Sequence, residues 1–413
     1  MKDSGIAWVG EIPQEWQTMP LYCLYSERKN INALGKENNL LSLSYGKVVR
    51  KDINTSEGLL PSNYNGYNIV ECDDIIIRPT DLQNDKRSLR TGLAKERGII
   101  TSAYIALKPK QGVNSHYFHY LLHSYDISKV FYNMGNGVRQ GLNYDEFAKL
   151  IMLVSSNLEQ QRIADFLDKE CEKIDGLKTD IQLQIDTLEQ YKRSVITEAV
   201  THGLNHNAPV KDSGVDYIDE IKADWKISKI GFVCTKLTRG FSEDDPALIC
   251  SNKGNVVFRD EQHACGKMVS EDNAMQGIHI GDIAIHGMDT WHGAIGFSKI
   301  RGKITRVVHV CDSTEDKRFV VYYLKSLAYQ GVYKLISNGI RGNTSDFRSW
   351  DKVKDIYICL PPLDEQKGIA DYLDHKCTEI EQIIANKNTQ LETLDEYKKS
   401  MIYEYVTGKK EVA

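Results

Sequence analysis

The chain has 413 residues, too many for one hydrophobic core, and we expect two to four domains. Hydrophobic residues make up 41% of it, yet no stretch approaches the roughly 18 apolar residues of a membrane span, and the first residues are not those of a signal peptide. A net charge of -5 at first argues against a nucleic-acid binder. We therefore expect a cytoplasmic protein, and its nine cysteines, which include no Cys-x-x-Cys pair, to be reduced core thiols.

The chain begins with a segment that it later repeats. Residues 2–16 read KDSGIAWVGEIPQEW and residues 211–225 read KDSGVDYIDEIKADW, with Trp16 and Trp225 at equivalent places. Each copy of this lead-in segment is followed by a long block and then by a helical stretch. The chain therefore repeats one unit of lead-in segment, block and helix.

Each block has the pattern of a small α+β domain. Both contain turns followed by short apolar strands and then a helical stretch, and both contain a Gly-Val-Arg or Gly-Ile-Arg turn before the next repeat. The matching ranges are 72–78 and 280–286, 97–101 and 301–305, 115–132 and 316–336, and 136–139 and 338–341. We expect two domains of one fold whose sequences have otherwise diverged.

The most faithful repeat is helical. Residues 159–201 and 365–407 align without a gap and are identical at 19 of 43 positions. Alternate steps of four and three residues give a heptad seam in each copy, and about 38 residues of helix would be about 57 Å long. We expect the two seams to pack on each other; the alternative is that each helix only covers its own domain. The seam residues are Leu167, Ile174, Ile181, Ile185, Leu188, Val195, Leu373, Ile380, Ile384, Leu391, Leu394 and Met401.

Charge follows the same repeat. Residues 16–157 contain 17 Lys and Arg against 13 Asp and Glu, and residues 225–362 contain 19 against 15. The helical stretches are acidic, with 6 against 10 in residues 158–203 and 7 against 11 in residues 363–413. Basic blocks suit duplex DNA, which shares the approximate two-fold symmetry of such a chain, and acidic helices suit protein partners. The alternative is that each small imbalance has no meaning.

Several motifs occur together in the order of one protein family. They are the Trp-containing lead-in segment, the Gly-Val-Arg and Gly-Ile-Arg turns, Leu-Pro-Pro-Leu-Asp-Glu-Gln at 360–366, the Ile-Ala-x-x-Leu-Asp runs, and the final Thr407-Gly408. Over essentially its whole length the chain resembles the specificity subunit of type I restriction-modification systems. It departs from the pattern at residues 155–160, which lack the prolines of the second copy and leave the shape of the first junction open.

The resemblance implies an α+β fold: two pseudo-symmetric target-recognition domains joined by two long helices that form an antiparallel intramolecular coiled coil. It also implies a non-catalytic subunit that reads a bipartite, asymmetric site in double-stranded DNA, with the helices setting the length of the unspecified spacer. The expected partners are two methyltransferase subunits, which would carry S-adenosylmethionine, and restriction/translocase subunits; no cofactor is expected in this chain. The implied segments are residues 1–157, 158–203, 204–224, 225–362 and 363–413.

Candidate DNA contacts are Arg and Lys for guanine and phosphate, and Asn and Gln for adenine, in loops. Arg139 and Arg341 are the best supported, because they recur at equivalent turns, although a shared structural ion pair would also explain this. In the first block the candidates are Lys47, Arg50, Lys51, Arg87, Arg90, Arg139, Gln140 and Asn143. In the second they are Lys253, Arg259, His286, Trp291, His292, Arg306, Arg341, Asn343 and Arg348.

Catalytic interpretations do not fit the sequence. It contains no Asn-Pro-Pro-Tyr or Asp-Pro-Pro-Tyr motif of an adenine methyltransferase, and Gly302-Lys303-Ile304-Thr305 lacks the first glycine of a phosphate-binding loop. His116, His119 and His123 have helical spacing and could share a metal, but their aromatic surroundings favour helix packing. The remaining alternative to DNA recognition is a protein scaffold with only non-specific affinity for DNA.

Overall fold

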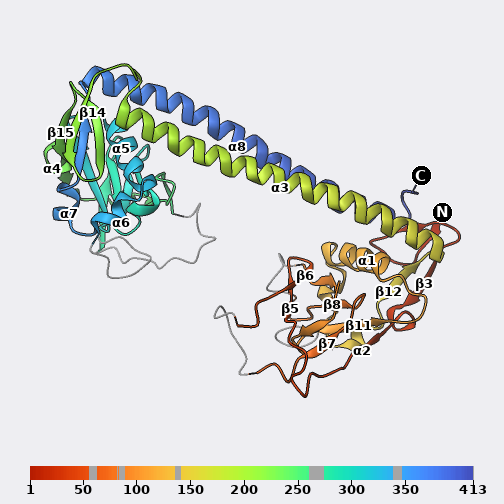
Figure 1. The fold of residues 1–413 in the computed structure, drawn as a ribbon. Helices are drawn as coiled ribbons and strands as arrows, with labels where there is room; N and C mark the ends of the chain where they lie inside the picture. Colours follow the sequence, from red (N-terminus) through yellow and green to blue (C-terminus); the bar gives the residue numbers. More distant parts are fainter. Residues whose placement is uncertain are drawn as a thin grey trace. The chain divides into compact units, whose positions relative to one another are not determined.

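The chain folds into two compact units in the computed structural model, which describes residues 1–54, 63–80, 82, 89–134, 141–259, 274–337 and 347–412 (Figure 1). Unit 1 comprises Met1–Ile181 and Thr389–Ala413, and unit 2 comprises Gln182–Asn388. Both contain helices and short, mainly antiparallel strands, which is the predicted α+β class. In the described part of the chain, no helix is both long and apolar enough to cross a membrane.

Unit 1 begins with two short hairpin strands and ends in a long helix. Its elements are β1 (Lys2–Asp3), β2 (Glu11–Ile12), β3 (Gln17–Pro20), the 3-10 turn η1 (Leu21–Cys23), β4 (Tyr25–Glu27), β5 (Leu41–Ser44), β6 (Lys47–Arg50), β7 (Asn68–Val70), β8 (Ile75–Ile77), β9 (Thr91–Leu93), β10 (Gly98–Ile100), β11 (Ile105–Pro109), α1 (Ser115–Ile127), η2 (Val130–Asn133), α2 (Tyr144–Phe147) and β12 (Ile151–Val154). The first part of α3 (Asn157–His202) follows.

Unit 2 repeats this order after the end of α3. Its elements are β13 (Val210–Val215), β14 (Ile218–Lys222), β15 (Lys226–Lys229), α4 (Ile230–Val233), β16 (Cys234–Leu237), β17 (Ala247–Cys250), β18 (Val256–Phe258), β19 (Met275–Ile278), β20 (Ile283–His286), η5 (Thr290–His292), β21 (Ile295–Phe297), β22 (Gly302–Thr305), β23 (Val308–Ser313), α5 (Lys317–Tyr329), α6 (Val332–Ile336), α7 (Trp350–Lys354) and β24 (Tyr357–Leu360). The helix α8 (Leu363–Val406) begins here and ends in unit 1.

The two units share one strand topology. The four-stranded sheet of unit 1 has the order β4-β11-β8-β9, and that of unit 2 has the order β16-β23-β20-β21. The pairs β3–β12, β5–β6 and β7–β10 correspond in the same way to β15–β24, β17–β18 and β19–β22. The lead-in segments form the hairpins β1–β2 and β13–β14. The duplication that the helices show in sequence therefore extends through the blocks in structure.

The predicted strands and helices are confirmed, but the helical stretches in the blocks are each divided. The first breaks at Lys129, whose φ of 58° is left-handed, and the second breaks at Gly331, with a φ of 75°. A left-handed residue cannot continue a right-handed helix, so α1 and α5 end before these positions. The following turns, η2 and α6, pack back against the preceding helix.

Each unit has its own core, which includes one end of each long helix. In unit 1, Met401, Ile402 and Val406 of α8 are buried with the side chains of α1 and the lead-in segment. In unit 2, Ile196 and Val200 of α3 are buried with the side chains of α5 and the second lead-in segment. Hence each lead-in segment packs on the last turns of the helix that comes from the other repeat.

A tryptophan of each lead-in segment bonds to the first turn of a long helix. The Nε1 of Trp16 donates to Glu159 Oε2 at 3.0 Å, and Trp225 Nε1 donates to Glu365 Oε2 at 3.0 Å. Both indoles are fully buried. Lys222 pairs with Glu365 at 2.7 Å, whereas Pro13 occupies the equivalent place in unit 1. Without that counter-charge, burial raises the pKa of Glu159.

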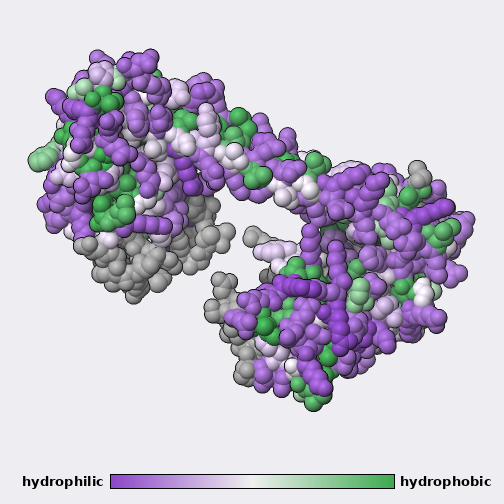
Figure 2. Space-filling model, viewed as in Figure 1, coloured by the Kyte–Doolittle hydropathy of each residue, from purple (hydrophilic) through white to green (hydrophobic). Residues whose placement is uncertain are grey.

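The two long helices contact each other antiparallel within each unit. In unit 1, Lys398 donates to Asp175 at 2.6 Å and Lys178 pairs with Asp395; in unit 2, Lys192 pairs with Glu381. Every one of the twelve predicted seam residues is buried or half-buried, while hydrophobic residues off the seam, such as Leu183 and Tyr397, are exposed. Figure 2 shows such hydrophobic side chains as isolated patches among hydrophilic ones on the long helices.

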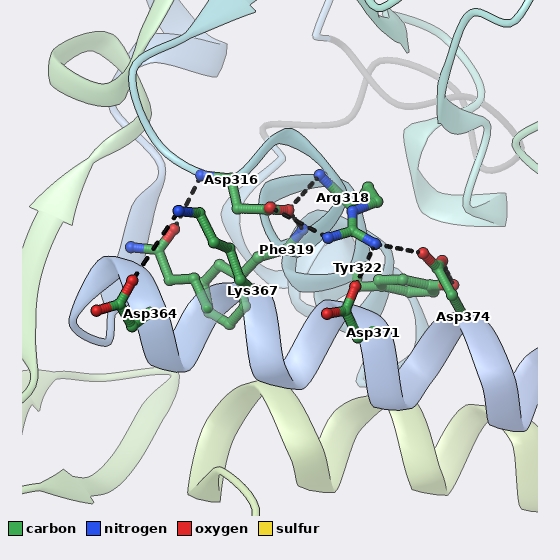
Figure 3. Close-up of polar contacts among 9 residues, drawn as sticks. Asp316, Arg318, Phe319, Tyr322, Asp364, Lys367, Asp371 and Asp374 are labelled. Carbon is green, nitrogen blue, oxygen red and sulfur yellow. Dashed lines mark hydrogen bonds and ion pairs between the residues drawn. The ribbon is translucent and has the colours of Figure 1, made fainter.

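A polar cluster joins the first helix of each block to a long helix. In unit 2, Figure 3 shows Arg318 of α5 lying between Asp316 and two carboxylates of α8; its Nη1 is 2.7 Å from Asp371 and 2.8 Å from Asp374. Tyr322 donates to Asp374 at 2.8 Å. In unit 1 the equivalent bonds are made by His116, 2.9 Å from Asp168, and by Tyr120, 2.8 Å from Asp168. A histidine thus replaces the arginine in unit 1.

Candidate nucleic-acid interface

The β5–β6 hairpin of unit 1 contains three of the candidate cations. Lys47, at its turn, is 2.8 Å from Asp175 of α3, so this lysine attaches the hairpin to the helix. Arg50 bonds to Glu96 in an exposed ion pair, with its Nε 2.6 Å from Oε1. Lys51 is exposed and has no ion-pair partner among the described residues. Of the three, Lys51 is the one most available to a phosphate.

Two other candidates of unit 1 have structural roles. Arg90 is fully buried, its backbone N–H donates to Asp126 and its guanidinium donates to Thr80 O. A side chain held in the core cannot enter a DNA groove, so the prediction for Arg90 is not supported. Asn143 caps α2 and accepts a bond from Glu146 N at 2.9 Å. Arg87, Arg139 and Gln140 lie outside the described residues.

A cavity of about 900 Å³ lies in unit 1 between this hairpin, α1 and the two long helices. The three histidines singled out from the sequence line it, but they do not act alike. His116 bonds to Asp168, whereas enclosure lowers the pKa of His119 to about 3 and that of His123 to about 4. No group of three or more His, Cys, Asp or Glu suited to a metal occurs among the described residues. The arrangement agrees with helix packing.

Three loops of unit 2 meet around Gly287, directly after β20. The backbone N–H of Gly287 donates to Val307 O at 2.9 Å, and Phe347 N donates to Gly287 O at 3.0 Å. A Cβ at Gly287 would be 2.9 Å from the Cα of Arg348, so only glycine permits this approach. The three loops bring together the candidates His286, Arg306 and Arg348.

A second group of unit 2 candidates surrounds η5. Trp291 and His292 have ring centroids 4.3 Å apart, and Lys334 of α6 lies 4.6 Å from the centre of the Trp291 ring. The β17–β18 turn carries exposed Lys253. This turn lies close to the segment, since a Cβ placed at Gly293 would be 4.0 Å from Asn252 O. Lys334 is not among the candidates predicted from the sequence, because it lies in a helical stretch 43 residues after Trp291 and nothing local pairs the two.

The remaining candidates lie at loop ends. Arg259 follows β18 directly, and its backbone N–H donates to Ala247 O at 2.9 Å. Arg341 and Asn343 lie outside the described residues.

In unit 1, Leu142 N donates to Pro79 O at 3.0 Å, the counterpart of the Phe347–Gly287 bond. Both units therefore join the loop after the third strand of the sheet to the segment just before a short helix.

The chemistry of these groups is that of binding. The described candidates outside the core are cations, imidazoles, one indole and one amide, in loops or in short elements beside them. These groups match phosphates, base edges and stacking surfaces. The loops share a place in the fold but differ in residues between the units. One scaffold therefore presents two different sets of side chains.

No family model matches the chain. It is 23% identical over 433 aligned positions, covering 97% of this chain and 95% of the relative, to the putative type I restriction enzyme MjaX specificity subunit of Methanocaldococcus jannaschii. A solved chain from work on the assembly and conformational transition of a type I R-M system is similar in fold, with a TM-score of 0.67, 13% identity and coverage of 96% and 99%. The HsdS subunit of Thermoanaerobacter tengcongensis gives a TM-score of 0.47 at 13% identity, with coverage of 96% and 98%. Over nearly its whole length the chain is thus similar to a type I restriction enzyme specificity subunit, which confirms the resemblance seen in its motifs.

Proposed function

We propose that this chain is the non-catalytic, sequence-specific DNA-binding subunit of a type I restriction-modification complex. Each unit reads one half of a bipartite, asymmetric site in double-stranded DNA. The observation that carries the proposal is the repetition of one strand topology with two different sets of loop side chains. Two equal scaffolds with unequal loops suit two different half-sites, and the similarity to a specificity subunit points the same way.

In this proposal, residues 1–157, which include the first lead-in segment, and residues 225–362 are the target-recognition domains. The helices α3 and α8 form an antiparallel coiled coil that sets the spacer. The contacts Lys178–Asp395 and Lys387–Gln184 support the coiled coil. The steps of four and three that give the seam residues also reach Lys178 and Lys387, at non-equivalent positions, so these two lysines fix one register. The lead-in segments and the linker 204–224 then belong to the joints between domain and helix. The domain boundaries follow the repeat in the sequence.

The same helices are the proposed docking surface for two methyltransferase subunits, and restriction/translocase subunits would join that complex. Their acidity and their exposed hydrophobic residues off the seam, such as Leu177 and Tyr397, favour protein over phosphate. S-adenosylmethionine would bind to the methyltransferase. This chain would supply only the choice of sequence.

Selection from a randomised duplex pool tests the proposal. The chain, purified with its methyltransferase, is expected to recover a two-part motif with a fixed gap, and Lys51→Ala is expected to weaken binding evenly and to lower the salt slope by about 1. Asp52→Asn, at the next position in the chain, serves as the control for a change of charge in this block. Affinity that ignores sequence and falls uniformly with salt would instead favour the protein scaffold.

A further inference from the structure

A groove of about 280 Å³ lies in unit 2 at the end of α3. Three of the residues that line it, Tyr191, Tyr372 and Leu204, are 54%, 37% and 45% exposed. Ala199 lines the groove and is itself buried. The residues that form it come from α3, from the segment after it and from α8: Tyr191, Val195, Ala199, Leu204, His206 and Tyr372.

The other repeat shows what fits such a space. At the offset of 206 residues, Tyr372 corresponds to Phe166 and Ala199 corresponds to Tyr405. In unit 1 the rings of Phe166 and Tyr405 pack with centroids 4.5 Å apart and an interplanar angle of 44°. The groove of unit 2 is therefore the place that unit 1 fills with an aromatic ring of its own.

The two units also differ in the ion-pair partner of a glutamate beside this place. In unit 1, Glu404 pairs with Lys410 at 2.8 Å. Its counterpart in unit 2 is Glu198, whose ion-pair partners among the described residues are two histidines, His206 at 3.5 Å and His202 at 3.8 Å. The side chain of Glu198 is 55% exposed, and it has no Lys or Arg partner among the described residues.

We propose that this groove receives an aromatic side chain, with a neighbouring Lys or Arg, from the methyltransferase subunit. The inference rests on the proposed function and specifies one of its contacts. The partner ring packs on Tyr372 as Tyr405 packs on Phe166, and the partner cation pairs with Glu198 as Lys410 pairs with Glu404. An aromatic ring in a partly enclosed site is a typical anchor of protein interfaces. Since Tyr405 already fills the equivalent place in unit 1, the two methyltransferase positions are not equal.

Ala199→Tyr tests this by filling the groove from within, and Ala199→Ser is the matched control that leaves it open. Native mass spectrometry and titration with the purified methyltransferase are the measurements. Ala199→Tyr is expected to weaken one of the two binding positions about tenfold or more, and Ala199→Ser is expected to leave both unchanged. Full binding of two copies by a folded Ala199→Tyr variant would overturn the inference.

A second variant covers the case in which Ala199→Tyr does not fold. A photo-crosslinking phenylalanine analogue at Tyr191, on the exposed wall of the groove, is expected to link to a methyltransferase peptide that contains an aromatic residue. Links only to DNA or to this chain itself would contradict the inference. Selection of a bipartite motif is run in parallel. If no motif is recovered, the proposed function fails; if the motif is recovered but binding and crosslinks do not depend on the groove, only the inference fails.

Discussion

The polar cluster between α1 and α3 predicts a pH dependence that its counterpart in unit 2 lacks. The bond to Asp168 is the main cause that raises the pKa of His116 above its ordinary 6.5, and Asp73, with an oxygen 3.7 Å from Nε2, acts in the same direction, while Lys95 opposes it. A raised pKa means that the folded chain holds the proton more tightly. The stabilisation is complete below the ordinary pKa and is lost as the pH rises through the folded pKa.

The partner carboxylate does not limit this window. Burial raises the pKa of Asp168, but the bonds from His116 and Tyr120 outweigh it, so the pKa is lowered on balance. Asp168 therefore stays charged down to acid pH. The side chains of His116 and Asp168 are 45% and 48% exposed, which puts the pair among surface ion pairs worth about 0.2–1 kcal/mol. A loss of 1 kcal/mol changes the opening equilibrium of α1 by roughly a factor of five.

Hydrogen exchange measured by mass spectrometry follows each unit separately through peptides from α1 and α5. Comparing His116→Ala with the parent chain at one pH cancels the intrinsic exchange rate. At pH 5.5 the protection factor of α1 is expected to be up to about fivefold lower in the variant than in the parent chain. At pH 9 the two protection factors are expected to be almost the same. His116→Arg is expected to remove the pH dependence, and Arg318→His is expected to introduce one in α5. Equal losses at both pH values would refute the reasoning.

Three further predictions concern the joints and the long helices. Lys222→Met leaves Glu365 beside the buried Trp225 without its counter-charge, and it is expected to lower the free energy of unfolding, measured by chemical denaturation, by about 3 kcal/mol. The double variant Lys222→Met/Glu365→Gln is expected to recover most of this loss. An unchanged free energy of unfolding in the single variant would contradict the prediction. Leu373→Ala, in the core of unit 2, is expected to cost about 2–5 kcal/mol, whereas the exposed Leu183→Ala should change the unfolding free energy by less than about 0.5 kcal/mol. Inserting four residues after Ile181 and four after Asn388 lengthens both helices by about 6 Å. The motif selected from the randomised duplex pool is then expected to have a longer spacer and unchanged half-sites. Altered half-sites with the original spacer length would show that the helices do not set the spacer.

The long helices could be located from the sequence because their signal is local and periodic. Seam residues recur at steps of four and three, so a few turns suffice to see the pattern, and in the structure all of the predicted seam positions are buried or half-buried. The break between α1 and η2 could not be predicted, because the sequence has no local signal for it. It depends on the left-handed backbone of Lys129, a residue type with no preference for that conformation.

The candidate interface could be predicted only in part, because the role of a charged residue depends on partners far away in the chain. Arg90 lies in a polar stretch and was taken as exposed, yet it is buried: its guanidinium donates to Thr80 O, and its backbone N–H donates to Asp126 of α1. Lys47 reaches Asp175, 128 residues later. The lead-in tryptophans bond to Glu159 and Glu365, and here the sequence did hold a usable signal, since both members of each pair recur in the other repeat.

The division of unit 1 into two stretches of chain affects how the protein is made on the ribosome. Unit 2 is continuous, so all of its residues are available once synthesis passes Asn388. Unit 1 needs Met401, Ile402 and Val406 to close its core, and these follow unit 2 in the chain. At about 5–20 residues per second, the 207 positions between Ile181 and Thr389 take roughly 10–40 s to translate. During that time the nascent first half exposes an apolar surface, which makes it a natural client for chaperones.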